Sequence, residues 1–515
     1  MTDATIRLWG RDIGAVSWLE DRDHAVFQYV PEFVASGIAV SPLVMPPSLA
    51  PYAFPELPRD AFKGLPGLLA DSLPDKYGNA LIDAWLTRQG RDARSFNPVE
   101  RLCYIGTRGM GALEFHPTLM KAARRSRRLQ IEALVDLANQ VLSMRQDMKG
   151  VLSGEDDHDT LEEILRVGTS AGGARAKAVL AWNEETGEFR SGQAPAGEGF
   201  SDWLMKFDGV SNNRDKELAD PQGFGLIEYA FSRMAADVGI DMAECRLHHE
   251  GGRSHFMTRR FDRTPDGRKL HMQSLGALRH FDFNAAGAYS YEQAVETIRL
   301  LGLGAADIEQ QFRRAVFNLF IRNQDDHVKN IAFLMDRSGG WRLSPAFDVG
   351  YAYNPSGPWT STHQMTFNGK RDGFILEDLV AFGAHCGFKR RKTLGMVREI
   401  AAWNHRQRSA GRPTVRIGIG IDTGTVLAGP IGAPARMDYT VIGAAVNIAA
   451  KLQQAGDGHS SPVLVSARAC GQLVREHQLG DAEMVSIGRR GRQVAAHRLQ
   501  VGLPGSERDL ESIAA

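Results

Sequence analysis

The sequence feature that most constrains the fold is an abrupt change from apolar to polar residues near position 322. The run Ala315–Ile321 has the composition of a buried segment, and Asn323–Asn330 then holds two carboxylates, two asparagines, a histidine and a lysine. Burying such groups is costly unless they are paired or bind a ligand. Another carboxylate, Asp348, follows later, again beside apolar residues. The chain is therefore expected to fold around a polar site.

Length and composition set broader limits. The 515 residues suffice for two or more domains, and 43% hydrophobic with 24% charged residues is ordinary for a soluble protein. The formal net charge is zero, so no overall basic field favours nucleic acid or an anionic membrane. The four cysteines form no CxxC pair, and no leader or long apolar run is present. These features predict a cytoplasmic protein without a membrane partner.

Periodicity gives a coarse map of the elements. Alternation over residues 4–30 predicts a small antiparallel sheet with turns at 10–14 and 20–23. Helices are predicted at 75–88, 129–147, 224–238, 305–322 and 373–403. Strands are predicted at 178–182 and 203–207, with a strand edge at 255–263.

The polar cluster offers the groups that phosphoryl transfer needs. The reaction requires a carboxylate to take the acceptor proton, oxygen ligands for Mg²⁺, a cation on the phosphates and a loop covering them. Asp325 fits the base, Asn330 and Asp348 fit the metal ligands, and Lys206 fits the cation. The glycine-rich stretch Gly168–Lys177 fits the loop. We therefore predict an ATP-dependent phosphotransferase that uses Mg²⁺.

Each motif has a simpler interpretation when taken alone. Asp325–His327 could be a helix-terminal cap with a core histidine, or part of a metal-hydrolase site. The glycine-rich stretch has neither a Walker motif nor a clean GxGxxG and could be a turn. Lys206 alone would be a surface lysine. A protein-kinase site, however, also separates an aspartate from an asparagine by five positions and adds a later magnesium aspartate, so the combination favours a kinase.

Over roughly residues 5–403, the chain resembles HipA-family serine/threonine kinases, the toxins of type II toxin–antitoxin systems. The resemblance rests on Leu65–Gly78, Gly168–Lys177, Arg260–Arg263, Asn323–Asn330 and Phe347–Asp348. It implies an α+β, bilobal, protein-kinase-like fold with a small N-terminal β subdomain.

The resemblance also implies roles for individual residues. Asp325 would be the catalytic base, Asn330 and Asp348 would hold Mg²⁺, and Lys206 would contact the ATP phosphates. Ser170 would be autophosphorylated, which adds nearly two negative charges beside ATP and switches the kinase off; taken alone, Ser170 could be a turn serine. The other residues expected at the cofactor are Gly168, Ala171, Gly172, Gly173, Lys177, His327 and Lys329, the last two supporting the loop.

The partners implied by the resemblance are proteins. Family members phosphorylate a protein substrate, an aminoacyl-tRNA synthetase in the known cases. A small HipB-like helix-turn-helix antitoxin holds the kinase and makes most of the DNA contact. The chain would then reach DNA only through this antitoxin, and its zero net charge agrees with that division.

The C-terminal part resembles a different family. Arg416–Gly429 and Met437–Leu452 are similar to the second half of a class III nucleotidyl cyclase domain, which implies a partial α/β, ferredoxin-like segment. The strands that would supply two metal-binding aspartates are replaced by the kinase. Ala444 stands where a purine-reading carboxylate is expected, and Lys451 stands where an arginine is expected. We interpret 405–515 as a degenerate cyclase-like segment.

These interpretations divide the chain into four predicted domains. They are a HipA-type N-terminal subdomain (1–120), a kinase N-lobe with the phosphate loop (121–265), a helical C-lobe with the catalytic loop (266–404) and the cyclase-like segment (405–515). Two alternatives stay open. The junction near Trp403 could remove the last C-lobe helices and leave an impaired binding protein, and the C-terminal segment alone favours a cyclase-related signalling protein.

Overall fold

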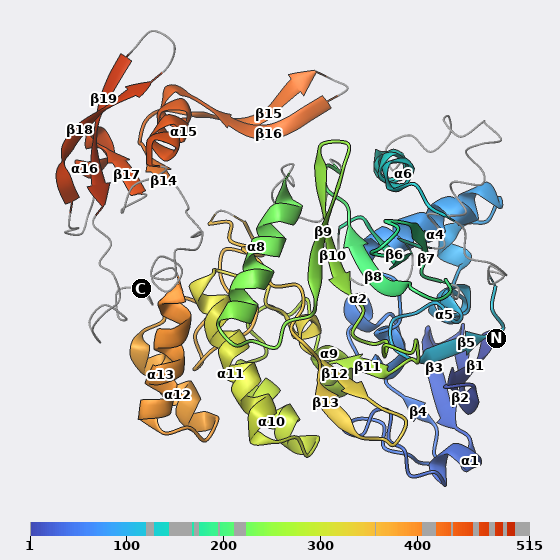
Figure 1. The fold of residues 1–515 in the computed structure, drawn as a ribbon. Coiled ribbons are helices and arrows are strands. Elements are labelled where there is room, and N and C mark those ends of the chain that lie inside the picture. The colour runs from blue at the N-terminus through green and yellow to red at the C-terminus, as the bar shows by residue number, and fades with distance from the viewer. Residues whose placement is uncertain are drawn as a thin grey trace. The chain divides into compact units, whose positions relative to one another are not determined.

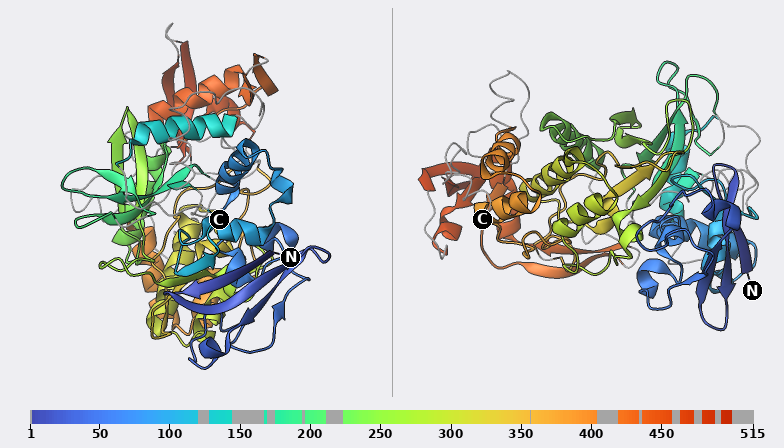
Figure 2. Two further views of the ribbon diagram at one scale, coloured as in Figure 1. Left: turned by 90° about the vertical axis from the view of Figure 1, so that its right-hand side faces the viewer. Right: turned by 90° about the horizontal axis from the view of Figure 1, so that it is seen from below.

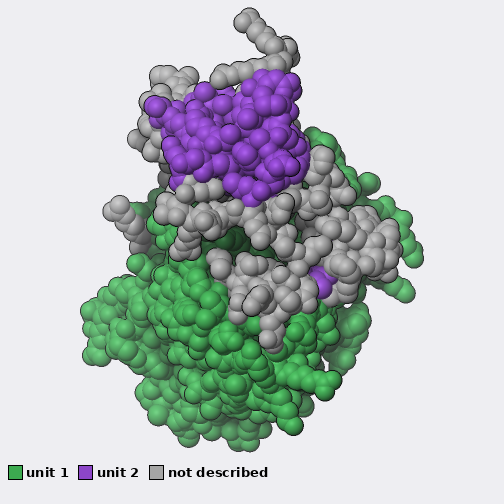
Figure 3. Space-filling model, turned by 90° about the vertical axis from the view of Figure 1, so that its left-hand side faces the viewer, with its two compact units in different colours: residues 1–400, 514–515 green, residues 401–513 purple. Residues whose placement is uncertain are grey.

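The chain divides into two compact units, residues 1–400 with 514–515 and residues 401–513 (Figure 3). The computed structural model (Figure 1) describes residues 2–119, 128–143, 167–168, 175–193, 196–210, 223–355, 357–403, 419–433, 436–456, 463–472, 479–487 and 492–499. Among these residues, no helix is long and apolar enough to cross a bilayer.

The first unit begins with a five-stranded antiparallel sheet in the order β4-β3-β2-β1-β5. Ile6, Val16 and Phe27 are fully buried, because alternate residues of a strand share one face. The sheet predicted over residues 4–30 is confirmed, although Gly14 lies inside a strand and not in a turn. The strands are β1 (Thr2–Leu8), β2 (Arg11–Leu19), β3 (His24–Tyr29), β4 (Tyr52–Ala53) and β5 (Leu113–His116).

Helices α1 to α5 and one 3₁₀ turn lie between β3 and β5 in the sequence. The carboxylate of Asp75 accepts a hydrogen bond from the Gly78 amide at 2.7 Å and so starts α4. Asn97 and Glu100 form a capping box at the start of α5. The elements are α1 (Pro31–Val34), α2 (Arg59–Phe62), α3 (Gly67–Ala70), α4 (Lys76–Arg88), the 3₁₀ turn η1 (Ala93–Ser95) and α5 (Pro98–Ile105).

A second five-stranded sheet has the order β7-β6-β8-β10-β9, with helix α8 packed on β9 and β10. The strand predicted within residues 255–263 is observed as β10, but it ends at Arg259 and lies between β8 and β9, so the predicted edge position is wrong. Gly251 and Gly252 both have positive φ and close the β9–β10 hairpin. The elements are α6 (Ile131–Ser143), β6 (Lys177–Trp182), β7 (Phe189–Ser191), β8 (Ser201–Lys206), α8 (Phe224–Asp237), β9 (Cys245–Glu250) and β10 (Arg253–Arg259).

The rest of the first unit is mainly helical, and Figures 1 and 2 show α12 and α13 at the opposite end from the N-terminal sheet. A three-stranded sheet, β11-β12-β13, lies between these parts. The elements are β11 (His271–Ser274), α9 (Leu275–Arg279), α10 (Tyr291–Leu300), α11 (Ala305–Phe320), β12 (Ala332–Met335), β13 (Trp341–Leu343), α12 (Leu376–His385) and α13 (Arg390–Ala401).

The helices before the junction are present and packed. Phe312 of α11 stacks on Phe382 of α12, with ring centres 5.6 Å apart. Arg313 of α11 forms an ion pair of 2.9 Å with Glu399 of α13. The single helical stretch predicted over 373–403 is broken, because Gly387 adopts φ 84° between the two helices. This packing fixes the helices that precede the junction, and the alternative in which the junction removes later helices stays open.

The second unit holds a four-stranded sheet in the order β14-β17-β19-β18 and a separate ribbon, β15-β16. Ile448 and Leu452 of α15 form a small core with Leu464 of β17. Within the described residues, β14 pairs only with β17, so it forms an open edge of the sheet. The elements are β14 (Ile419–Ile421), β15 (Leu427–Ala433), β16 (Arg436–Ile442), α15 (Ala444–Gly456), β17 (Val463–Ser466), α16 (Ala467–Cys470), β18 (Leu479–Ile487) and β19 (Arg492–Leu499).

His271 of β11 makes the stability of the first unit depend on pH. The side chain is fully buried, with Nε2 2.9 Å from the Val40 carbonyl oxygen, and burial lowers its pKa to about 4 although this hydrogen bond raises it. An unfolded histidine binds a proton near pH 6.5. The stabilisation is therefore complete above pH 6.5 and is lost as the pH falls towards 4.

We expect the contribution of His271 to the free energy of unfolding to fall by about 2 kcal/mol between pH 7 and pH 5. Urea unfolding of the wild type and of His271→Gln at both pH values measures this contribution. The variant should lose less stability than the wild type over this interval. Equal losses in the two proteins would contradict the prediction.

Candidate active site

The predicted catalytic loop follows directly from the buried helix α11. The loop ends in a single 3₁₀ turn, η3 (Val328–Asn330). The side-chain amide of Asn330 donates a hydrogen bond to the backbone carbonyl of Asp325 at 2.9 Å, which closes the loop on itself. The side chain of Asp325 is 27% exposed, whereas that of Asp326 is 1% exposed. Of the two adjacent carboxylates, only Asp325 is therefore accessible enough to act as a base.

Asp326 binds the loop to the buried residues around it. Its carboxylate accepts hydrogen bonds from the Tyr291 hydroxyl at 2.7 Å and the Gln364 amide at 2.8 Å, and pairs with His363 Nδ1 at 2.8 Å. Burial raises the pKa of Asp326, but His363 and the hydrogen bonds lower it further, so the net pKa is below its usual value. Asp326 thus stays ionised and holds the loop in place.

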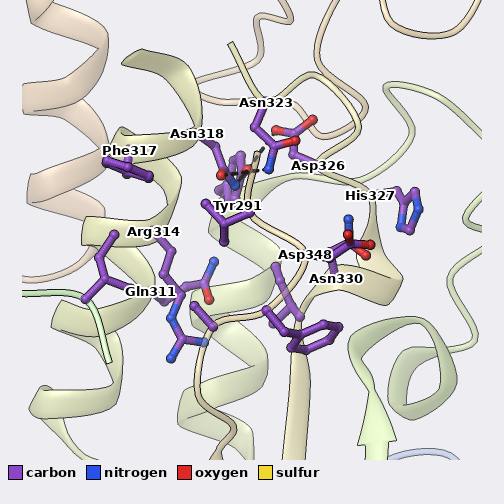
Figure 4. Close-up of a pocket in the computed structure, with 15 residues that line it drawn as sticks. Tyr291, Gln311, Arg314, Phe317, Asn318, Asn323, Asp326, His327, Asn330 and Asp348 are labelled. Atoms are coloured by element: carbon purple, nitrogen blue, oxygen red, sulfur yellow. Dashed lines mark hydrogen bonds between the residues drawn. The ribbon is translucent and has the colours of Figure 1, made fainter. Parts of the chain in front are cut away.

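Asn330 and Asp348 line the same pocket (Figure 4). His327 and Asn330 lie on one side of this pocket, and Gln311 and Arg314 lie on the other. Asp348 adopts φ 55°, a left-handed conformation that is uncommon for residues with a side chain and tolerated best by Asp and Asn. The fold therefore brings the two predicted metal ligands together.

Lys206 connects the sheet to this pocket. It is the last residue of β8, and its Nζ lies 2.5 Å from Asp348 Oδ1 and 2.6 Å from Glu228 Oε1. Burial lowers the pKa of Lys206, but the charges of Asp348 and Glu228 more than offset this effect, so the pKa is raised. Lys206 is therefore a cation held beside Asp348, and its contact with the ATP phosphates stays a prediction.

The sequence reasoning missed Glu228. This residue lies on α8, is 4% exposed, and also accepts a hydrogen bond from Arg175 at 3.1 Å. Arg175 belongs to the end of the glycine-rich stretch, so Glu228 connects that stretch to Lys206. A lysine on a strand paired with a glutamate on a helix is also a part of protein-kinase sites. The available signal was a carboxylate directly after the apolar residues Leu226 and Ile227 in the helix predicted at 224–238.

Lys177 has a buried partner from the N-terminal subdomain. Its side chain is 1% exposed, and its Nζ lies 2.9 Å from a carboxylate oxygen of Asp75. Lys177 is paired in register with Lys206 on the neighbouring strand. Asp75, to which the sequence assigned no role, therefore joins helix α4 to the strand beside the site. A contact of Lys177 with ATP stays a prediction.

The remaining predicted residues make weaker contacts with Asp325 or contact other parts of the chain. His327 Nε2 is 3.9 Å from Asp325 Oδ1. Lys329 Nζ lies 4.4 Å from the ring centre of Phe283, a cation–π distance. A Cβ on Gly168 would meet the Leu81 side chain at 2.7 Å, so the chain passes tightly there. The predicted loop residues Ser170, Ala171, Gly172 and Gly173 lie outside the described residues.

Asn330 and Asp348 offer two oxygen ligands. This number suits Mg²⁺ shared with substrate phosphates better than a metal ion bound by protein side chains alone. No group of three or more His, Cys, Asp or Glu side chains that could hold a metal ion occurs in the described part of the chain. Mg²⁺ prefers oxygen ligands and is usually bound by one or two carboxylates together with substrate phosphates. With the Asn330 amide nitrogen engaged by Asp325, its Oδ1 is the atom that fits such a cation.

Two family models match most of the first unit. The family model described as "HipA N-terminal domain" matches residues 4–116. The family model described as "HipA-like C-terminal domain" matches residues 169–407. The chain belongs to the HipA family. A third model, adenylate and guanylate cyclase catalytic domain, matches residues 389–496, so this HipA protein carries a cyclase-related C-terminal segment as predicted.

A solved structure shares the HipA fold. A chain in the complex of HipA, HipB and operator DNA from Shewanella oneidensis MR-1 superposes with a TM-score of 0.56 at 18% identity. The match covers 80% of this chain and 92% of that chain. The predicted α+β, HipA-like fold is thereby confirmed.

Curated relatives match parts of the chain. "Adenylate cyclase 1" of Rhizobium meliloti (strain 1021) is 34% identical over 107 residues, which are 20% of this chain and 16% of that protein. "Putative kinase Y4mE" of Sinorhizobium fredii (strain NBRC 101917 / NGR234) is 28% identical over 126 residues, which are 23% and 30% of the two chains. The chain thus spans less than a third of the length of either relative.

The HipA and cyclase matches overlap at residues 389–407, which include α13. In the structure, the Glu399 carboxylate of α13 pairs with Arg313 of α11. Lys392 of α13 also pairs with Glu309 of α11 at 2.6 Å. The helix shared by the two matches therefore packs as part of the kinase-like helical lobe.

Proposed function

We propose that this HipA protein is an ATP- and Mg²⁺-dependent protein serine/threonine kinase of the toxin type. The observation that carries the proposal is the convergence of Lys206, Glu228 and Asp348 in one partly buried charge network. Asp348 lines one pocket with Asn330, and Asn330 binds the backbone of Asp325. The residues proposed as base, metal ligands and phosphate-binding cation are thus linked by these contacts, although Lys206 and Asp348 are far from Asp325 and Asn330 in the sequence.

Each residue has a separate task in this proposal. Asp325 would accept the proton of the acceptor hydroxyl, because its carboxylate is partly exposed at the loop. Asn330 and Asp348 would hold Mg²⁺, which supplies charge neutralisation at the phosphates when bound. Lys206 would exchange its contact with Asp348 for a phosphate oxygen, while Glu228 keeps the lysine in place. Little covalent chemistry is needed from the protein, since positioning and charge do most of the catalysis.

Substrate, regulation and partners form the finer part of the proposal. We propose a cytoplasmic kinase that acts on a protein, with an aminoacyl-tRNA synthetase as the candidate substrate, and on its own Ser170. A HipB-like antitoxin is the proposed partner, and DNA is reached through it. The solved Shewanella complex contains HipA, HipB and operator DNA, which supports this partner. The predicted boundaries at residues 120, 265 and 404 are kept as proposals.

Metal removal tests the proposal. Purified protein is incubated with ATP labelled on the γ-phosphate, with Mg²⁺ or with excess EDTA. We expect label on the protein with Mg²⁺ and loss of the transfer with EDTA. Release of labelled inorganic phosphate without labelled protein would identify an ATPase and contradict the kinase.

The C-terminal segment supports a second candidate function. Its match to the cyclase family favours a cyclase-related signalling role, and Ala444 and Lys451 both lie on α15. Neither residue supplies the carboxylate or the guanidinium expected there, so we propose a docking or regulatory segment without cyclase activity. Formation of a cyclic nucleotide from ATP or GTP in the same incubations would contradict this proposal.

A further inference from the structure

The segment 357–364 is fixed against the catalytic loop by buried polar contacts. Asp326 binds both the His363 ring and the Gln364 backbone amide, each at 2.8 Å. The side-chain amide of Gln364 donates to the Gln324 carbonyl at 3.2 Å. Asp326, His363 and Gln364 are all at most 3% exposed. The position of this segment relative to the loop is therefore set by hydrogen bonds that water cannot easily replace.

The same contacts fix Trp359. The Gln364 side-chain amide also donates a hydrogen bond to the Trp359 carbonyl. The indole Nε1 of Trp359 then donates to Asp325 Oδ1 at 2.7 Å. Adjacent carboxylates of the loop thus have linked tasks: Asp326 holds the segment, and the segment presents an N–H group to Asp325.

An indole N–H group suits the task of orienting a base. It is a donor only, so it cannot compete with Asp325 for the proton of an acceptor hydroxyl. A carboxylate has two oxygens, and the hydrogen bond to Oδ1 leaves Oδ2 to receive that proton. The indole thus holds one oxygen of the Asp325 carboxylate, while Asn330 holds the backbone of the same residue.

We propose that Trp359 is a positioning residue that holds the Asp325 carboxylate ready for the acceptor hydroxyl. The inference rests on the proposed kinase function, in which Asp325 is the base. Pre-orientation lowers the barrier because fewer conformations must be sampled before reaction, and a small misplacement of a reacting group reduces the rate strongly. The opposite role is a gate, in which the indole blocks Asp325 until a substrate displaces it.

Trp359→Phe separates the two roles, because phenylalanine keeps a ring and removes the N–H group. We expect kcat for phosphate transfer to fall by about tenfold to a hundredfold, with the KM for ATP and the melting temperature unchanged. Trp9→Phe is the matched control, since the indole of Trp9 donates a hydrogen bond of the same 2.7 Å length to the Lys269 carbonyl, in another part of the unit. This control should keep the wild-type kcat. An unchanged or raised kcat in Trp359→Phe would overturn the proposal, and a raised value would identify a gate.

A second variant decides the matter if Trp359→Phe lowers the melting temperature. Trp359→His keeps a planar ring with an N–H group, and we expect it to restore part of the lost kcat. Equal kcat values for the His and Phe variants would overturn the role of the N–H group. Failure of the kinase proposal itself is distinguished by Asp325→Asn: if that variant keeps wild-type activity, Asp325 is not the base. If it loses activity while Trp359→Phe keeps it, only the inference on Trp359 fails.

Discussion

Asp325→Asn is expected to reduce the rate of phosphate transfer by about 10²–10⁴-fold, the usual contribution of a general base. Asparagine has the same shape as aspartate but cannot take up the acceptor proton. Its side-chain oxygen can still accept the indole hydrogen bond of Trp359, and Asn330 binds the backbone and not the side chain. The fold and the binding of Mg²⁺ and ATP should therefore stay intact. Initial rates with γ-labelled ATP measure the phosphate transfer, and calorimetric titration measures the binding of ATP in the presence of Mg²⁺.

A matched control for this variant is Asp336→Asn. Asp336 accepts a hydrogen bond from the Ser338 amide at 2.8 Å in an exposed turn after β12. This substitution removes the same charge at a position away from the pocket and should leave the transfer rate unchanged. Equal rates in Asp325→Asn and the wild type would remove Asp325 from the chemistry, and a loss of ATP binding would assign it to binding.

The second large effect is expected on stability, at the Arg-Phe-Asp-Arg motif. Asp262 is completely buried and accepts hydrogen bonds from Arg260 at 2.7 Å, Arg263 at 2.8 Å and the Gly111 amide at 2.6 Å. Burial raises its pKa, but the two arginines lower it further, so the pKa lies well below its usual value. This carboxylate connects the end of β10 to the glycine-rich turn before β5.

Asp262→Ala should lower the free energy of unfolding by about 3–5 kcal/mol, because it leaves buried arginine charges without their counter-charge. Urea unfolding followed by circular dichroism measures the change. Asp266→Ala is the control: Asp266 pairs with Arg268 at 2.6 Å, but both side chains are more than half exposed. An exposed pair contributes little to stability because solvent screens its charges. Similar losses in the two variants would contradict the structural role of Asp262.

The sequence predicted the elements that carry strong local signals. The helix over 305–322 is observed as α11 at Ala305–Phe320, because its apolar positions repeat with the helical period. Asp325, Asn330 and Asp348 could be singled out because polar residues directly beside apolar runs are costly to bury. The structure brings Asn330 and Asp348 into one pocket, and their roles in binding Mg²⁺ stay predictions.

The residues that were missed act through contacts distant in the chain. Glu228 meets Lys206 across 22 positions, and Trp359 meets Asp325 across 34. Asp75 meets Lys177 across 102. No periodicity or local motif encodes such pairs, because they depend on how separate elements pack. The predicted edge position of β10 was wrong for the same reason. This strand pairs with β9 in a hairpin and with β8 on its other side, and the pairing with β8 is a long-range contact.

The most direct test of the account is the mass of the intact protein after incubation with Mg²⁺ and ATP, for the wild type and Asp325→Asn side by side. The account predicts that the wild type gains phosphate, at Ser170 when the modified peptide is sequenced, and that the variant gains none. A wild type that binds ATP and Mg²⁺ but gains no phosphate, or a variant that gains as much as the wild type, would contradict it.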